Sequence, residues 1–247
     1  MENINSALTE TFDIPGYSIY QGTVPKSVTL RAMTAKEERM RIAGTSFNVI
    51  PMLIQKCIVD SDFDVSQLKM FDIQRLMYAL RIVTYGPDYP VKLKCPKCGR
   101  TIETTLNLDQ IPLNYAPEDF KEPFEIGPLP ITGDVLTCKI PSLQDMLDII
   151  DERNRMMKRS PEMEDPSFVL EYTKKIRAVN GAVLAPSEMF EYVNNLYMKD
   201  IRFFDCRYAE FDKNFGMEKF LELECPHCNN SFKFEVPVSE EFFRPEL

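Results

Sequence analysis

Hydrophobic and polar residues alternate in two stretches of the chain, and each stretch leads into the same kind of helix start. The alternating apolar positions are Val28, Leu30 and Ala32 in one stretch, and Leu136, Cys138 and Ile140 in the other. A period of two predicts a strand with one buried face. Thr34 and Ser142 follow, each with a carboxylate three residues later. This spacing is typical of a capping box, so we expect a helix to begin directly after each strand.

Helical periodicity follows in both regions. Apolar residues recur every three or four positions at Leu143, Met146, Leu147 and Ile150, and again at Ile73, Leu76, Met77, Leu80 and Val83. Such stripes are typical of helices that bury one face in a core. The second stripe ends at Gly86-Pro87, a pair that terminates helices. We interpret both stripes as core packing rather than as binding surfaces.

The order of strand, helices and hairpin occurs twice, which indicates an internal duplication. Leu68-x-Met70-x-Asp72-Ile73 matches Leu196-x-Met198-x-Asp200-Ile201 at an offset of 128 positions (72 to 200), and Thr34 matches Ser142 at 108 (34 to 142). The expected fold class is therefore α+β and helix-rich, built from two related halves. We place an N-terminal arm at residues 1–26, the first half at 27–116 and the second half at 117–247.

Two C-P-x-C motifs lie between alternating stretches, as expected for the turns of β-hairpins: Cys95-Pro-Lys-Cys98 and Cys225-Pro-His-Cys228. Thiolate pairs at this spacing bind zinc, and four thiolates form a closed structural site that leaves no position for a substrate. We predict one structural Zn²⁺ bound by Cys95, Cys98, Cys225 and Cys228, where the two halves join in a zinc ribbon-like site. Two separate zinc sites, one for each motif, are the alternative.

A dithiol redox site is a second interpretation of Cys225-Pro-His-Cys228. Redox cysteines of this kind lie at the start of a helix, where the helix dipole lowers the thiol pKa. Here Phe232, Phe234 and Val236 alternate after the motif and predict a strand instead. The context therefore favours zinc, and His227, the only histidine of the chain, is expected to be a solvated turn residue.

The charge pattern bears on the choice of partner. The net charge of −9 opposes general binding to nucleic acid, which depends on clustered basic residues. Lys92 and Lys94 precede the first motif, and Glu222 and Glu224 stand at the same positions before the second motif. Lys97 and Arg100 add two further positive charges near the first motif. We interpret the opposite charges as contacts between neighbouring hairpins. A zinc-ribbon regulator that binds nucleic acid is the alternative function.

Composition argues against catalysis and against a membrane protein. The chain has one histidine, nine glycines and no phosphate-binding loop, so the usual catalytic constellations are absent and we predict no enzymatic activity and no small-molecule substrate. No apolar run is long enough to span a membrane, and the polar start has no signal-peptide character, so we expect a cytoplasmic protein. Seven cysteines indicate reduced thiols rather than a disulfide framework.

Aromatic residues at both ends of the chain leave two possibilities open. Residues 1–26 carry Phe12, Ile14, Tyr17 and Tyr20 among glycines and prolines, and the C-terminal tail carries Phe242 and Phe243. Each segment is expected either to order on a partner or to fold back on its own domain.

The first half carries a further signal in the segments Val28-Thr-Leu-Arg-Ala-Met-Thr-Ala-Lys-Glu-Glu38, Ile54-Gln-Lys-Cys-Ile58, Asp72-Ile-Gln-Arg-Leu76 and Lys94-Cys-Pro-Lys-Cys-Gly99, with the strand Ile102-Glu-Thr-Thr-Leu106. In these segments the chain resembles the baseplate proteins of T-even-type contractile-tailed phages, a group that includes baseplate hub assembly proteins. The second half resembles them only through the repeat. The resemblance implies a structural subunit of the tail baseplate or a factor that assembles its hub or wedges. Its partners would be other baseplate or tail proteins, in the host cytoplasm during assembly or in the virion.

Overall fold

The computed structural model describes residues 8–43, 49–59, 62–211, 215–236 and 240–243. The chain forms two compact units. Unit 1 comprises Met1–Phe63, Phe71–Ala116 and Asn214–Leu247, and unit 2 comprises Asp64–Met70 and Pro117–Lys213. Unit 1 is therefore assembled from three segments of the chain, and residues from both ends of the sequence contribute to it.

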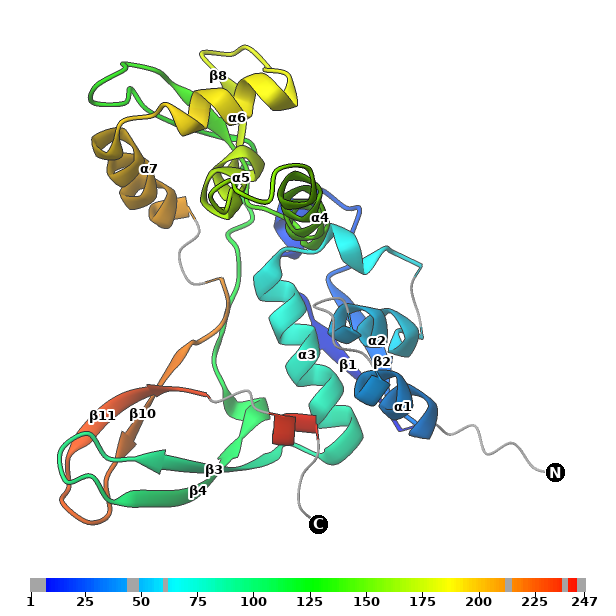
Figure 1. The fold of residues 1–247 in the computed structure, drawn as a ribbon. Coiled ribbons are helices and arrows are strands. Elements are labelled where there is room, and N and C mark those ends of the chain that lie inside the picture. Colours follow the sequence, from blue (N-terminus) through cyan, green and yellow to red (C-terminus); the bar gives the residue numbers. More distant parts are fainter. Residues whose placement is uncertain (1–7, 44–48, 60–61, 212–214, 237–239, 244–247) are drawn as a thin grey trace. The chain divides into compact units, whose positions relative to one another are not determined.

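Unit 1 begins with an antiparallel hairpin of β1 (Thr9–Asp13) and β2 (Ser27–Arg31), which encloses the 3-10 helix η1 (Tyr17–Tyr20). Three helices follow, α1 (Ala35–Ala43), α2 (Val49–Cys57) and α3 (Met70–Tyr85), and Figure 1 shows β1 and β2 beside α3. The predicted cap is confirmed, since the Lys36 N–H donates to Thr34 Oγ1 over 3.3 Å and the Thr34 N–H donates to Glu37 Oε2 over 2.9 Å.

The predicted stripe on α3 is confirmed as core. Ile73, Leu76 and Leu80 are buried, and the helix ends before Gly86. The φ angle of Gly86 is +87°, in the left-handed region that an L side chain adopts only with strain, which explains why glycine stops the helix here.

The N-terminal segment belongs to the core of unit 1. Phe12, Ile14, Ile19 and Tyr20 are at most 8% exposed, because β1 pairs with β2 along its whole length and η1 turns its apolar side inward. Of the two possibilities left open by the sequence, folding back is the one observed for residues 8–26. The other possibility, that these aromatic residues become ordered only on a partner, does not hold for residues 8–26.

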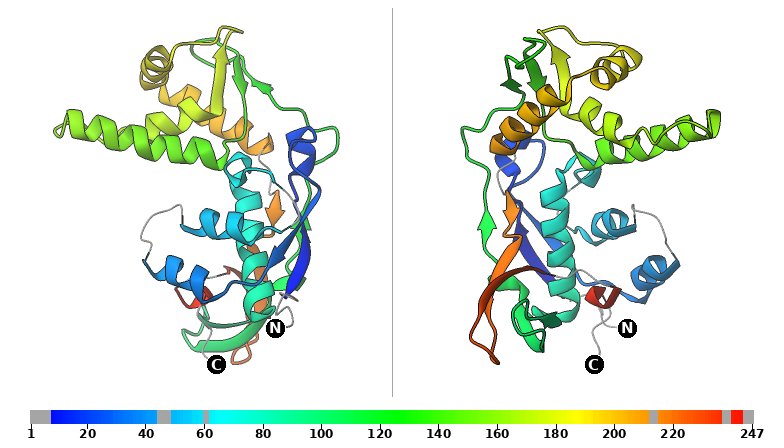
Figure 2. Two further views of the ribbon diagram at one scale, coloured as in Figure 1. Left: turned by 90° about the vertical axis from the view of Figure 1, so that its right-hand side faces the viewer. Right: turned by 60° about the vertical axis from the view of Figure 1, so that its left-hand side comes forward.

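Two further hairpins complete unit 1. They are formed by β3 (Asp88–Lys94) with β4 (Thr101–Asn107) and by β10 (Phe220–Glu224) with β11 (Ser231–Glu235). The 3-10 helix η3 (Leu108–Gln110) follows β4, and β5 (Leu113–Asn114) pairs with β9 (Gly216–Met217) just ahead of the second hairpin. This short pairing joins distant parts of the sequence, and Figures 1 and 2 show the two hairpins side by side in every view.

The C-terminal tail also packs within unit 1. The 3-10 helix η4 (Glu240–Phe243) carries Phe242, whose ring lies 4.9 Å from that of Tyr78 and 5.2 Å from that of Tyr89. Phe242 is 0% exposed and Phe243 is 5% exposed. The tail thus closes the core between α3 and β3, instead of presenting its aromatic rings to solvent.

Unit 2 combines a small sheet with helices. Its strands β6 (Phe124–Ile126), β7 (Leu136–Cys138) and β8 (Ile176–Val179) form one antiparallel sheet in that order. The helices are α4 (Leu143–Arg159), α5 (Ser167–Lys175), α6 (Pro186–Asn194) and α7 (Met198–Phe211), and the 3-10 helix η2 (Val65–Gln67) belongs to the same unit. Ser142 and Asp145 form the predicted capping box at the start of α4.

The architecture is a mixture of helices and small sheets, in agreement with the α+β class. The sequence boundaries at 26/27 and 116/117, and the duplication on which they rest, stay predictions. Among the residues that the structure describes, no helix combines the length and the apolar character needed to cross a membrane.

Candidate metal centre

Each C-P-x-C motif forms the turn of a hairpin, and the two turns are built alike. Four backbone hydrogen bonds define them: Cys95 N–H to Arg100 O (3.0 Å), Gly99 N–H to Cys95 O (2.9 Å), Cys225 N–H to Asn230 O (3.0 Å) and Asn229 N–H to Cys225 O (2.9 Å). Gly99 and Asn229 have φ angles of +69° and +54°. Glycine and asparagine are the residues that best tolerate this left-handed conformation, so the local sequence specifies the turn.

The two turns bring four sulfur atoms together. The Sγ atoms of Cys95 and Cys228 lie 3.7 Å apart, and those of Cys98 and Cys225 lie 3.8 Å apart. All four sulfurs lie within 4.8 Å of one another. Zinc–thiolate bonds of about 2.3 Å in a tetrahedron place neighbouring sulfurs about 3.8 Å apart. The cluster therefore has the ligand type and the spacing of a four-thiolate metal site.

Apolar side chains support one side of the cluster. Cys95 and Cys225 are buried with Ile102, and Leu223 and Phe232 pack against them. Cys98 is exposed and Cys228 is half-buried. The first cysteine of each motif thus belongs to the core between the hairpins, and the second lies at its edge. The apolar side chains between the two hairpins thus hold the sulfurs of Cys95 and Cys225 in place.

The pKa values of Cys95 and Cys228 are shifted in opposite directions. The backbone N–H of Cys98 is the largest of the effects that lower the pKa of Cys95 to about 6, and the opposing effect of burial is smaller. The backbone N–H of Asn230 favours the thiolate of Cys228, but burial and the three neighbouring sulfurs outweigh it and raise the pKa of Cys228 to about 12. Several negative charges cannot share this small volume without a cation, because like charges disfavour one another.

The remaining cysteines do not join the cluster. Burial raises the thiol pKa of Cys57 to about 11 and that of Cys138 to about 12, which suits inert core residues. Cys206 lies exposed on α7. His227 is exposed in the second turn and is not part of the cluster. Because Cys225 and Cys228 lie between β10 and β11, the motif lacks the helix start that a redox site uses.

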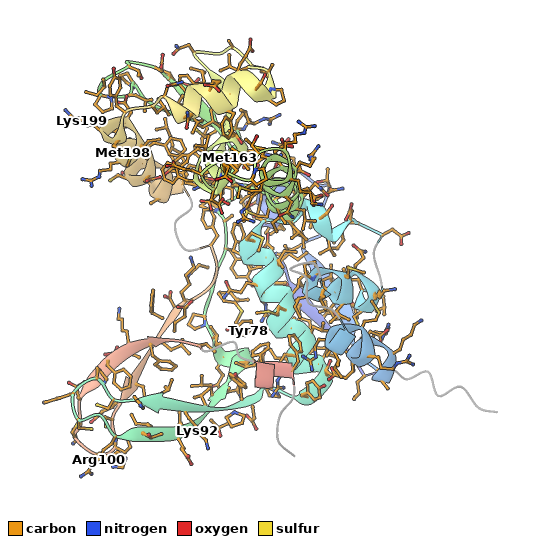
Figure 3. The ribbon with its side chains drawn as sticks, in the orientation of Figure 1. Tyr78, Lys92, Arg100, Met163, Met198 and Lys199 are labelled. Carbon is orange, nitrogen blue, oxygen red and sulfur yellow. The ribbon has the colours of Figure 1, made fainter. Side chains whose placement is uncertain are left out.

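The charged residues near the motifs pair differently from the sequence-based expectation. Lys92 and Glu103 are opposite each other in the first hairpin, with Nζ 3.3 Å from the carboxylate. Glu222 and Lys233 are opposite each other in the second hairpin. The complementary charges therefore face each other across the strands of one hairpin. Lys92 and Glu103 are about three-quarters exposed, so their ion pair adds little stability. Figure 3 labels Lys92 and Arg100 on this hairpin.

Asp72, Asp200 and Lys69 are among the buried charged residues of the described part of the chain, and the sequence did not predict their burial. Asp72 and Asp200 are 0% exposed and accept backbone N–H groups, and Lys69 forms a buried ion pair with Glu122 over 2.8 Å. The two aspartates occupy matched positions of the predicted repeat, and this match was the only sign of them in the sequence. Nothing in the local sequence of Lys69 indicates burial, because its partner lies 53 positions away.

Comparison with known proteins supports one assignment. The model of the family described as T4 bacteriophage base plate protein matches residues 17–244, nearly the whole chain. No curated protein matches at the threshold of the search, and no solved structure does either. The matched region includes both hairpins with all four clustered cysteines. The chain therefore belongs to the T4-type phage baseplate protein family.

Proposed function

We propose that the protein is a non-enzymatic component of the phage tail baseplate, either a structural subunit or a factor that assembles the hub or the wedges. The observation that carries this proposal is the family match across residues 17–244. In this proposal the protein acts by contact with other baseplate or tail proteins, and one structural Zn²⁺ stabilises its unit 1. The ion supplies no chemistry beyond cross-linking, because four thiolates leave no open position.

The zinc assignment is supported by the donor set and its spacing. Four sulfur donors at tetrahedral separations select a soft cation such as Zn²⁺ over Mg²⁺ or Ca²⁺, which prefer oxygen. One shared ion is favoured over two, since each motif alone offers only two sulfurs and His227 is not part of the cluster. The ligands are Cys95, Cys98, Cys225 and Cys228. Elemental analysis of freshly reduced protein should give one zinc per chain, with only sulfur neighbours at about 2.3 Å in X-ray absorption.

The internal duplication is supported by ion pairs at matched positions. Arg31 pairs with the capping residue Glu37 over 3.0 Å, and Lys139 pairs with the capping residue Asp145 over 2.6 Å. Both members of the second pair lie 108 positions after those of the first (31 to 139, 37 to 145). We infer that one strand–helix unit was duplicated, and that each copy kept its cation beside its capping box.

The baseplate assignment is tested with tagged protein expressed in phage-infected cells. Affinity purification should recover other baseplate or tail proteins in fixed stoichiometry. A four-cysteine variant with Ser at positions 95, 98, 225 and 228 serves as control and should recover less, because the hairpins lose their cross-link. Recovery of host metabolic enzymes without any tail protein would contradict the proposal.

Nucleic-acid binding is the second candidate, and one observation favours it. Lys92, Lys94, Lys97 and Arg100 are all exposed on or beside the first hairpin. The acidic residues Glu222 and Glu224 are also exposed, on the second hairpin, and would repel the same phosphate backbone. Titration of labelled DNA and RNA at several salt concentrations separates the candidates. A binding constant that falls steeply with salt would support a nucleic-acid-binding regulator and overturn the contact-only function.

A further inference from the structure

The segment that precedes α3 is covered by the junction between β7 and α4. The Leu143 N–H donates to Leu68 O over 2.8 Å, and Lys69 pairs with Ser142 in an isolated antiparallel bridge. Lys69 Nζ donates to Ile140 O over 2.6 Å. These contacts lie within unit 2, and Leu68, Lys69 and Leu143 are 0%, 6% and 2% exposed. A strand–helix junction of this repeat therefore docks on the residues just before a long helix.

The repeat provides each partner of this contact a second time. Leu196 and Tyr197 correspond to Leu68 and Lys69, and Thr34 and Ala35 correspond to Ser142 and Leu143. We call residues 196–199 the open acceptor segment and residues 31–37 the open junction. In the open acceptor segment Tyr197 is 61% exposed and Met198 is 59% exposed. Figure 3 labels Met198 and Lys199 at the start of α7.

The open junction is exposed at the two residues that correspond to Ser142 and Leu143. Thr34 and Ala35 are exposed, whereas Leu143, the counterpart of Ala35, is buried. Beside the open acceptor segment, a hollow of about 600 Å³ is lined by Thr132, Tyr192 and Leu196, among others. Both surfaces that are covered in one half are thus accessible in the other, and the acceptor segment is bordered by space for a side chain.

We propose that the open acceptor segment binds the open junction of a second copy of this chain, by the contact that Leu68–Lys69 makes with Ser142–Leu143. The proposal rests on the duplication inferred above. Thr34 then pairs with Tyr197, and the Ala35 N–H donates to Leu196 O.

The contact is heterologous, because it joins two different surfaces. Each copy carries one acceptor segment and one junction, so binding leaves a free surface at either end and copies add head to tail. Rings form if the rotation between copies closes, and open series form if it does not.

Disulfide trapping tests the proposal on the full chain. Residues that face each other in an antiparallel pair have Cα atoms about 4.5–5.5 Å apart, within reach of a disulfide. Thr34→Cys and Tyr197→Cys are made separately in a Cys206→Ser background, with zinc present. Mixing the two variants under mild oxidation should give a covalent dimer at least ten times more abundant than either variant gives alone.

Matched variants make the result decisive. Thr34→Cys mixed with Val183→Cys, an 82% exposed position in the same unit as Tyr197, should give no dimer above background. The double variant Thr34→Cys/Tyr197→Cys should give a ladder of multimers. An internally linked monomer instead would place the contact within one chain and overturn the proposal, as would equal dimer yields from Tyr197→Cys and Val183→Cys. Zinc content and melting temperature, measured on the reduced variants, show separately whether the metal site and the fold are intact.

Discussion

Asp72 at the start of α3 and Asp200 at the start of α7 each accept a backbone N–H from a loop of their own unit. The buried carboxylate of Asp72 accepts the Gly16 N–H over 2.9 Å, and that of Asp200 accepts the Ile131 N–H over 2.8 Å. Gly16 lies in the loop between β1 and β2, and Ile131 lies in the loop between β6 and β7. Each aspartate also lies in the first turn of its helix, where the helix dipole favours a negative charge. In each unit one aspartate therefore ties the loop between two strands to the start of a helix.

Substituting Asp72 should loosen the N-terminal hairpin. Asp72→Ala leaves the Gly16 N–H and the Tyr20 hydroxyl buried without an acceptor, at an expected cost of about 2–4 kcal/mol. Hydrogen exchange should accelerate at residues 9–31. Asp200→Ala is the matched control and should accelerate exchange at 124–138 instead, with a smaller cost because its two donors are part-buried. Unchanged protection in both variants would show that these carboxylates do not hold the loops.

The four-cysteine cluster predicts coupled loss of order in both hairpins. Cys98→Ser should release the metal and accelerate exchange in β3–β4 and β10–β11 together. The loss should amount to several kcal/mol, less than the roughly 10–16 kcal/mol of isolated zinc-finger peptides, because unit 1 has its own core. Cys206→Ser removes another exposed thiol, one outside the cluster, and should change neither zinc content nor exchange. Opening of the first hairpin alone would argue for separate sites.

The N-terminal segment is expected to matter for stability rather than only for partner binding. Ile14→Ala removes a side chain that is 0% exposed and should cost about 2–5 kcal/mol. Leu8→Ala, at a position that is 72% exposed, should change stability by less than about 0.5 kcal/mol. Urea unfolding followed by circular dichroism measures both. Deletion of residues 1–20 should unfold unit 1, and a cooperative, unchanged transition of the truncated protein would contradict this.

Acid should weaken the ion pair beside the first capping box. The hydrogen bond from Arg31, followed by those from Thr34, lowers the pKa of Glu37 to about 2, against an ordinary value near 4.5. A lowered pKa in the folded state means that the stabilisation is complete above about pH 4.5 and disappears as the pH falls toward 2. Because Arg31 is a quarter exposed and solvent screens the pair, we expect about 1–2 kcal/mol.

The pH prediction is measured as a difference between two proteins. Acid also protonates the thiolates and releases metal, an effect that both share. The stability gap between the native protein and Glu37→Gln should therefore narrow only between about pH 4.5 and 2. A gap that stays constant over this window would show that the Glu37 charge contributes nothing.

The amino-acid sequence determined the local elements of this protein. Alternation predicted β2 and β7, the hydroxyl–carboxylate spacing predicted the starts of α1 and α4, and the C-P-x-C motifs predicted the two hairpin turns. Each of these depends on residues within a few positions of one another, where backbone preferences and short hydrogen bonds dominate. The convergence of the four cysteines was also predicted, because one type of ion satisfies both motifs.

Where a sequence pattern was compatible with more than one structure, only the tertiary structure decided which residues are buried and which are paired. The same aromatic composition suits a free arm or a buried strand, and burial of Phe12 and Phe242 depended on segments far away in the sequence. Lys92 pairs with Glu103 rather than with the second hairpin, because the turn fixes the strand register of the first hairpin and places these two residues opposite each other. Lys69 became a buried charge only because Glu122 and Ile140 O surround it. Contacts between distant segments leave no periodic trace in the sequence, so burial and pairing had to come from the fold itself.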